Sequence, residues 1–277
     1  MVLRGEAAKE KVPPVIQLRA VSFNLRVPMD SGVNAWKNRR GAVREVLKKI
    51  DADVIGTQEG VLRQLNDISA DFPDYTRVGI GRDRGGRGEQ MAVFFKTKRF
   101  AQLSQEHFWL SDTPEIAGST SWGNRNRRMV TGVRLKDKET GREFYFWNTH
   151  FDHLVAAARE KSAKLVVARA GRLDAAIPVV LTGDFNAVAG AGCKPYETLL
   201  EGGFVDTWVQ ARVRKNADFN TFNSFLEPVK KGRRIDWILV RPARGTKARV
   251  GKAAIVVERP NGIFPSDHFP VVVNLEL

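Results

Sequence analysis

Short apolar runs, separated by turn residues, recur along the whole sequence and restrict its fold more than any other feature. Each run has the length and residue types of a β-strand, and no apolar run approaches the roughly 18 residues that cross a bilayer. The predicted strands cover residues 19–25, 53–57, 91–95, 129–135, 144–149, 178–183, 235–240, 253–258 and 270–276.

A few stretches have helical periodicity instead. Residues 36–50 carry apolar side chains at the spacing of one helix face, with Lys and Arg opposite. Residues 155–170 are rich in Ala and other helix formers, and a weaker pattern covers about 61–70. Many strands with few helices indicate an α/β protein whose helices lie outside packed sheets. We predict a flexible N-terminal tail of residues 1–18 and a single domain over residues 19–277.

The formal net charge of +14 is the strongest signal in the composition. A basic surface attracts polyanions such as nucleic acid or anionic lipid, although surface charge can also serve solubility alone. Cys193 is the only cysteine, so an intrachain disulfide is excluded and a reducing compartment is favoured. The first 14 residues lack the apolar core of a signal peptide. We therefore expect a cytoplasmic protein, or a secreted or periplasmic one if a leader has been removed.

Polar residues stand at the ends of seven of the predicted strands. A charged side chain beside an apolar strand is costly unless it is paired or binds a metal, so this repetition predicts one shared cleft at one edge of the sheets. Carboxylates and carboxamides without cysteine suit Mg²⁺ or Mn²⁺. The residues are Asn24, Glu59, Glu89, His150, Asp152, His153, Asp184, Asn186, Asp236, Asp267 and His268.

Several other chemistries are excluded by missing motifs. The sequence has no Walker-type phosphate loop, no dinucleotide-binding Gly-x-Gly-x-x-Gly and no Gly-x-Ser-x-Gly elbow. Metal-assisted hydrolysis remains, with a histidine–aspartate pair available as general base. Taken alone, Asp184 and Asn186 predict a simple Asx turn, and His268 alone predicts a hydrogen-bonded core histidine.

Six stretches in this order resemble the endonuclease/exonuclease/phosphatase superfamily: "SFNLR", "GTQE", "NTHFDH", "GDFNA", "RIDWILV" and "SDHFPV". The resemblance covers about residues 19–277. The stretches "NAWKNRR" and "HFWLSDTPE" further resemble a bacterial subfamily whose substrates are poorly defined. The resemblance implies a four-layer α/β/β/α sandwich of two packed, mainly antiparallel sheets flanked by helices. It also implies a phosphoric ester hydrolase that depends on Mg²⁺ or Mn²⁺.

The metal site is implied by the same resemblance. Glu59 matches the family's main metal ligand, and Asn24 matches the residue beside it. Asp267 matches a second acidic residue near the metal. Asp184 matches the carboxylate that orients or activates the attacking water.

The remaining catalytic roles also come from the resemblance. His268 matches the histidine that contacts the scissile phosphate, and Asp236 matches its orienting carboxylate. Asn186 matches a phosphate-contacting carboxamide. His150 matches the histidine that helps the leaving oxygen, with Glu89 as its expected partner. Abasic-site endonucleases place a tyrosine where this chain has His150, which argues against a dedicated role in abasic-site repair.

Basic clusters adjoin the predicted site strands at residues 82–87, 125–128 and 230–234. A basic rim around a phosphate-hydrolysing cleft would favour a polyanionic substrate. The residues expected to bind substrate are Arg125, Arg127, Arg128, Asp152, His153 and Trp109. Asp152 and His153 could instead cap the following helix, and a tryptophan such as Trp109 is more often packed than free to stack a base.

These observations lead to two functional hypotheses. The first is a metal-dependent phosphodiesterase acting as a nuclease, endonuclease or exonuclease, on DNA or RNA. The alternative is a phosphatase or phosphodiesterase for a small-molecule or lipid-linked phosphate, such as a sugar phosphate, an inositol phosphate or a phospholipid head group. We expect a monomer with no obligate protein partner and no transmembrane segment.

Overall fold

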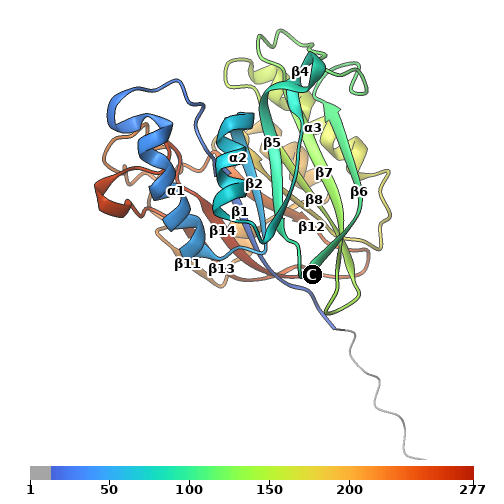
Figure 1. Cartoon of the computed structure of the whole chain (residues 1–277). Coiled ribbons are helices and arrows are strands. Elements are labelled where there is room, and N and C mark those ends of the chain that lie inside the picture. The colour runs from blue at the N-terminus through green and yellow to red at the C-terminus, as the bar shows by residue number, and fades with distance from the viewer. Residues whose placement is uncertain (1–13) are drawn as a thin grey trace, which may run out of the picture.

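In the computed structural model, which describes residues 14–277, two β-sheets pack face to face with helices outside them (Figure 1). The first sheet has the strand order β11-β13-β14-β1-β2-β5-β3, with β4 also paired to β5. Its strands are β1 (Gln17–Asn24), β2 (Val54–Gly60), β3 (Tyr75–Val78), β4 (Gly81–Asp83), β5 (Arg87–Lys96), β11 (Val213–Lys215), β13 (Arg249–Ile255) and β14 (Val271–Glu276).

The second sheet has the order β10-β12-β9-β8-β7-β6. Its strands are β6 (Phe100–Trp109), β7 (Met129–Asp137), β8 (Glu143–His150), β9 (Val179–Asp184), β10 (Val205–Asp206) and β12 (Asp236–Arg241). Most strand pairs in both sheets are antiparallel, and the parallel pairs are β1–β2, β8–β9 and β11–β13.

The helices cover both outer faces. They are α1 (Trp36–Ile50), α2 (Leu62–Asp71), α3 (Ala156–Ala170) and α4 (Lys194–Glu201), with short 3-10 turns at Gly32–Asn34, Arg84–Gly86 and Pro260–Gly262. A fifth, one-turn helix, α5 (Thr207–Gln210), instead packs Trp208 against the apolar side chains between the sheets. Helices α1 and α2 lie on the first sheet, and α3 lies on the second (Figure 1). The order of layers is therefore α/β/β/α, which confirms the predicted fold class.

Three apolar layers hold this arrangement together. The central layer lies between the sheets and includes Leu18 and Phe95 from the first sheet and Phe146 from the second. The second layer packs α1 against the first sheet, and the third packs α3 and α4 against the second sheet. Burying apolar side chains on both faces explains why so many of the strands read as continuous apolar runs.

Most predicted elements exist close to their expected bounds. Helix α1 matches 36–50, and all nine predicted strands are present, each shifted by a few residues at most except β5 and β13, which begin four residues earlier. Strands β3, β4, β6, β10 and β11 and helices α4 and α5 were not predicted. The predicted tail of residues 1–18 falls mostly outside the described residues; within them, β1 begins at Gln17, so Gln17 and Leu18 belong to the sheet.

Strand register brings the polar strand ends together. In the second sheet, Asp184 of β9 is paired with His150 of β8 on one side and with Asp236 of β12 on the other. In the first sheet, Asn24 at the end of β1 is paired with Gln58 of β2. His150, Asp184 and Asp236 therefore lie side by side at one end of the second sheet. Across residues 14–277, no helix has the length and apolar character needed to cross a membrane.

Candidate active site

A cavity of about 710 Å³ lies at the end of the sandwich where β2, β8 and β9 finish. Nine of the predicted site residues line it: Glu59, Glu89, Arg128, His150, His153, Asp184, Asn186, Asp267 and His268. Asn24 and Asp236 lie just behind this wall, where each is hydrogen-bonded to residues that line the cavity. The single cleft predicted from the strand ends therefore exists in the structure.

Glu59 is held in the cavity by an irregularity at the end of β2. The pairing of β2 with β5 slips between Thr57 and Gly60, so that β2 carries one extra residue, as in a β-bulge. Glu59 has a backbone φ of 61°, a left-handed conformation that is strained for a residue of its type. Its carboxylate accepts hydrogen bonds from Asn24 Nδ2 at 3.1 Å and from the Val27 amide at 3.0 Å. Such strain is typical of functional positions.

Asp184 lies at the centre of the cluster. Its Oδ2 accepts a hydrogen bond from Asn24 Nδ2 at 3.0 Å, and its Oδ1 accepts one from the Asn186 backbone amide at 2.9 Å. The second bond closes an Asx turn, and Asn186 itself is left-handed, with a φ of 48°. The turn and the site are therefore the same structure rather than alternatives. Burial, reinforced by the nearby Asp236, raises the pKa of Asp184 to about 7 although His268 opposes the shift.

The expected histidine–aspartate pair is present. His268 Nδ1 lies 3.0 and 3.2 Å from the two carboxylate oxygens of Asp236, and both residues are buried. Burial favours neutral imidazole, but Asp236 and Asp184 outweigh it and raise the pKa of His268 to about 10. At neutral pH His268 is therefore an imidazolium, which can donate to a phosphate but is already protonated and so cannot act as general base.

His150 has the opposite charge state. Its Nε2 lies 3.0 Å from Asn186 Nδ2 and 3.4 Å from Asp184 Oδ2. Burial and the positive charges of Arg128 and Arg82 lower the pKa of His150 well below its ordinary value, so the ring is neutral. Among residues 14–277, none forms a hydrogen bond with His150 Nδ1.

Glu89 lines the cavity, but its partner is not the expected one. Its carboxylate accepts a hydrogen bond from Arg82 Nη2 at 2.6 Å, whereas no hydrogen bond or ion pair joins it to His150 within the described part of the chain. The expected Glu89–His150 pair is therefore wrong. The reason is geometric: Arg82 lies on β4, which pairs directly with the strand that carries Glu89.

The substrate-binding predictions divide into two groups. Arg128 and His153 line the cavity and contact each other, with Arg128 Nη2 3.0 Å from His153 Nδ1. Arg125 is exposed and does not line the cavity, and Arg127 is turned outward to Asp83 and to the carbonyl of Gly118. The cavity therefore includes only one of the three arginines expected from this loop.

Asp152 and Trp109 are also placed differently from the prediction. Asp152 is buried and accepts hydrogen bonds from the backbone amides of Leu154 and Val155, which precede α3, so it stabilises the turn before the helix. The N-cap of α3 is Val155, so the capping alternative is wrong as well. Trp109 is only 4% exposed, packs in a cluster with Met91 and Met129, and donates from Nε1 to the Arg82 carbonyl. It cannot stack a base. The expectation that Asp152 and Trp109 bind substrate directly is therefore wrong.

Other residues of the cavity wall were not predicted: Arg26, Val27, Met29, Asp30, Asn126, Phe222, Ser224 and Phe225. Phe222 is half-exposed, and its ring lies 5.0 Å from the His268 ring. Ser224 and Phe225 both have left-handed backbones, with φ values of 55° and 58°. The sequence of this loop has no regular apolar periodicity that could have marked these residues. What distinguishes the loop is its strained backbone next to Phe222, which only the structure reveals.

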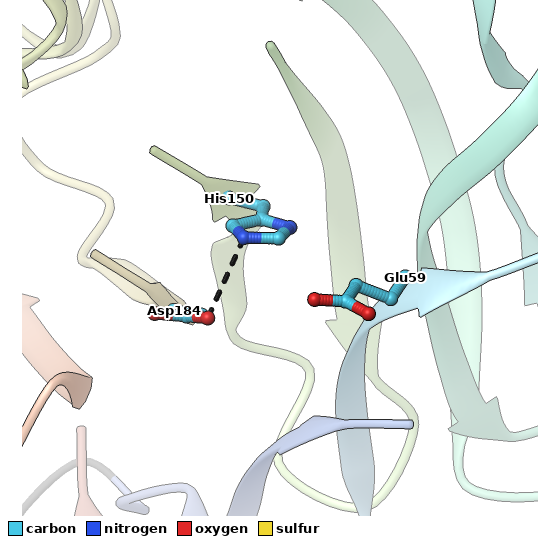
Figure 2. Close-up of side chains that lie close together, drawn as sticks. All are labelled: Glu59, His150 and Asp184. Carbon is cyan, nitrogen blue, oxygen red and sulfur yellow. Dashed lines mark ion pairs between the residues drawn. The ribbon is translucent and has the colours of Figure 1, made fainter. Parts of the chain in front are cut away.

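The acidic centre fits a hard cation. Glu59, His150 and Asp184 each offer one ligand atom, and these atoms lie within 4.8 Å of one another (Figure 2). Asp184, Asp236 and His268 form a second such group, but His268 and Asp236 already neutralise each other. Within residues 14–277 Glu59 forms no ion pair with a cationic side chain, so a cation would supply the missing charge. Oxygen donors without sulfur suit Mg²⁺ or Mn²⁺.

Comparison with known proteins agrees with this geometry. Residues 21–268 match the sequence model of the Endonuclease/Exonuclease/phosphatase family. The chain belongs to this family. Its members are phosphoric ester hydrolases that typically depend on a divalent metal.

Two bacterial structures are similar along nearly the whole chain. The endonuclease/exonuclease/phosphatase from Bacteroides vulgatus is 32% identical, with a TM-score of 0.87 over 95% of this chain and 99% of that one. The mannosyl-6-phosphatase Bt3783 of Bacteroides thetaiotaomicron is 33% identical, with a TM-score of 0.82 over 93% and 99%. Uncharacterized protein L388 of Acanthamoeba polyphaga mimivirus is 26% identical over 167 residues, which are 56% of this chain and 60% of that protein.

Proposed function

We propose that this protein is a divalent-metal-dependent phosphatase that hydrolyses the phosphate ester of a compact polar molecule, such as a sugar phosphate. The observation that carries the proposal is one cavity that brings together an acidic cluster, the His268–Asp236 pair and two buried arginines, Arg82 and Arg128. The similarity to a mannosyl-6-phosphatase supports the substrate class.

The residues take complementary roles in this proposal. Asp184 accepts a proton from the attacking water, because a pKa near 7 suits a general base at neutral pH. The His268 imidazolium, held by Asp236, stabilises negative charge that develops on the phosphate oxygens. Asn186 positions His150, because its side-chain amide lies 3.0 Å from His150 Nε2 and donates to the Phe151 carbonyl at 3.1 Å, and a contact with the phosphate would replace one of these two bonds. His150 stays neutral and contacts the leaving oxygen as a hydrogen-bonding group rather than as an imidazolium acid.

Glu59 is the residue that we expect to hold Mg²⁺ or Mn²⁺, with Asn24 and Asp267 beside it. Asn24 positions the two central carboxylates, because its amide donates to both Glu59 and Asp184. Asp267 lines the same cavity, 3.6 Å from Arg26 Nη1. When bound, the metal ion supplies Lewis-acid stabilisation of the phosphate charge.

A nuclease remains the second candidate because of the charge of the chain. The net charge is +14, and exposed basic residues border the active-site loops: Arg125, Lys230, Lys231 and Arg233. Such residues could contact a nucleic-acid backbone outside the cavity. We favour the phosphatase over the nuclease because a structure that is 33% identical over 93% of this chain is named a mannosyl-6-phosphatase.

One hydrolysis panel tests both candidates. The wild-type protein is incubated with Mg²⁺, Mn²⁺ or EDTA and with mannose 6-phosphate, glucose 6-phosphate, p-nitrophenyl phosphate, bis-p-nitrophenyl phosphate, plasmid DNA or single-stranded RNA. We expect metal-dependent release of phosphate from the monoesters, lost in Asp184→Ala and in His268→Ala. Metal-dependent cleavage of DNA or RNA without turnover of any monoester would refute the phosphatase and establish the nuclease.

A further inference from the structure

Arg82 and Arg128 are two buried arginines on one wall of the cavity. They are 8% and 3% exposed, yet both line the cavity. Arg82 lies on β4, and Arg128 directly precedes β7, whose partner strand β8 ends at His150. Segments from both sheets thus bring a guanidinium group into the cavity close enough to His150 for both positive charges to lower its pKa.

Each guanidinium is anchored on only one side. Arg82 Nη2 donates to Glu89 at 2.6 Å, and Arg128 Nη2 lies 3.0 Å from His153 Nδ1. Arg128 Nε is 3.8 Å from Asp152 Oδ2, which is within ion-pair range but too long for a hydrogen bond. Arg82 Nη1, Arg128 Nε and Arg128 Nη1 are buried and form no hydrogen bond with any residue of the range 14–277.

Unsatisfied donors of this kind are costly. A buried charged group without a hydrogen-bond acceptor loses its hydration without compensation, and two guanidinium groups close together also repel each other. Burial, together with the positive charge of Arg82, lowers the pKa of Arg128. An anion between the two side chains would supply acceptors for the free nitrogens and relieve the repulsion. The rigid fork of arginine suits phosphate oxygens in particular.

We infer that Arg82 and Arg128 form an anion subsite that takes a terminal oxygen of the substrate's phosphate and thereby selects phosphomonoesters over phosphodiesters. This inference rests on the proposed phosphatase function. A monoester has three terminal oxygens, and the His268 imidazolium, 3.8 Å from Asp184, lines the same cavity as the two arginines and can take another of them. In a diester, one of the three positions carries a second ester group, which offers no charged oxygen to the arginines.

The test compares Arg128→Gln and Arg82→Gln with Arg99→Gln. Arg99 is a suitable control because it is also largely buried and is paired with Asp53 and Asp137. It comes just after the last residue of β5, whereas Glu89 lies near the first, and it does not line the cavity. Affinity for inorganic phosphate is measured by calorimetry with Mg²⁺, and kcat/KM is measured for p-nitrophenyl phosphate and for bis-p-nitrophenyl phosphate. Thermal unfolding reports whether each variant is folded.

We expect phosphate affinity to fall roughly 10- to 100-fold in Arg128→Gln and in Arg82→Gln, the range for the loss of a charged hydrogen bond. The monoester kcat/KM should fall at least about 10-fold more than that of the diester. Arg128→Lys keeps the charge and should recover part of the phosphate affinity even if the glutamine variant is poorly folded. Arg99→Gln should leave phosphate affinity unchanged.

The inference is overturned by unchanged phosphate affinity in folded Arg82 and Arg128 variants, by equal losses on monoester and diester, or by the absence of saturable phosphate binding by the wild-type protein. A loss confined to substrates with a second anionic group would also overturn it, because the arginines would then bind that group. If the wild type hydrolyses no monoester but phosphate affinity still depends on both arginines, the proposed function fails while the anion subsite stands.

Discussion

Replacing Asp236 with asparagine tests the charge state on which the proposed chemistry depends. The carboxylate lies 3.0 Å from His268 Nδ1, and an asparagine there keeps a hydrogen-bond acceptor of similar shape but removes the charge. Loss of one opposite charge at this distance lowers a histidine pKa by roughly 1 to 3 units. Starting from about 10, His268 would then titrate between roughly 7 and 9. The wild-type imidazolium persists up to about pH 10, so the two proteins differ in charge mainly between pH 7 and 10.

Both the titration and the activity can be followed. The chain has four histidines, so the imidazole signals of ¹⁵N-histidine-labelled protein can be resolved and titrated individually. We expect kcat/KM at pH 9 to fall roughly 10²- to 10⁴-fold in Asp236→Asn, because an orienting and stabilising carboxylate is lost. The loss at pH 6, where His268 is charged in both proteins, should be clearly smaller.

A matched control separates this effect from general damage. Asp137→Asn removes a carboxylate that is also fully buried and paired, in this case with Arg99, outside the cavity. It should lower stability but leave the pH profile of kcat/KM unchanged. The reasoning is refuted if His268 still titrates near 10 in Asp236→Asn, or if the activity loss is the same at pH 6 and pH 9.

Three further substitutions test separate parts of the site. Glu59→Gln should weaken Mn²⁺ binding, measured by electron paramagnetic resonance, by at least about 10-fold, because a carboxylate is the stronger ligand; unchanged affinity would exclude Glu59 as a ligand. Glu89 has its pKa raised to about 7 by burial, so the folded state holds this proton more tightly than the unfolded state does, and the associated stability, present below pH 4.5, is lost as pH rises through 7. The wild type should lose about 3 kcal/mol of unfolding free energy across this window relative to Glu89→Gln in urea titrations, and parallel pH profiles would contradict this. Phe222→Ala should raise KM for a sugar phosphate roughly 3- to 10-fold with little change in kcat, since the ring forms a wall beside His268 without touching the reacting atoms, and a loss confined to kcat would argue against this role.

The elements that could be predicted are those whose buried residues form a recognisable apolar pattern in the sequence. Strands β8 and β9 are almost wholly buried and read as apolar runs, and α1 has a clear apolar face. Strand β6 was missed because it lies at the edge of its sheet and most of its side chains are exposed or partly exposed. Its sequence, FAQLSQEHFW, therefore lacks both a continuous apolar run and clean alternation. Backbone pairing, which no local pattern reports, makes it a strand.

The same distinction applies to the active site. Acidic and histidine residues at strand ends could be identified because burying a charged group beside an apolar strand is unfavourable unless the group is paired or binds a metal. Which side chain pairs with which could not, because Glu89 meets Arg82 only through the β4–β5 pairing. Likewise, Arg128 and Arg127 are adjacent in sequence, yet one faces the cavity and the other faces Asp83. Neighbouring side chains of an extended backbone point in opposite directions, so Arg128 can contact a substrate whereas Arg127 forms a surface ion pair.

Arg39 shows how a residue outside the site can shape it. The helical pattern of 36–50 placed its basic residues opposite the apolar face, but Arg39 lies one turn before Val43 on the buried face and is fully buried. Its guanidinium donates to the carbonyls of Asn34, Leu25 and Pro265 at 2.7, 3.0 and 2.7 Å. Those carbonyls belong to the two loops that carry Arg26 and Asp267 into the cavity. The buried guanidinium of Arg39 keeps its hydrogen-bond acceptors only while both loops hold their positions. Helix α1, which carries Arg39, therefore helps to fix the part of the cavity wall that these loops form.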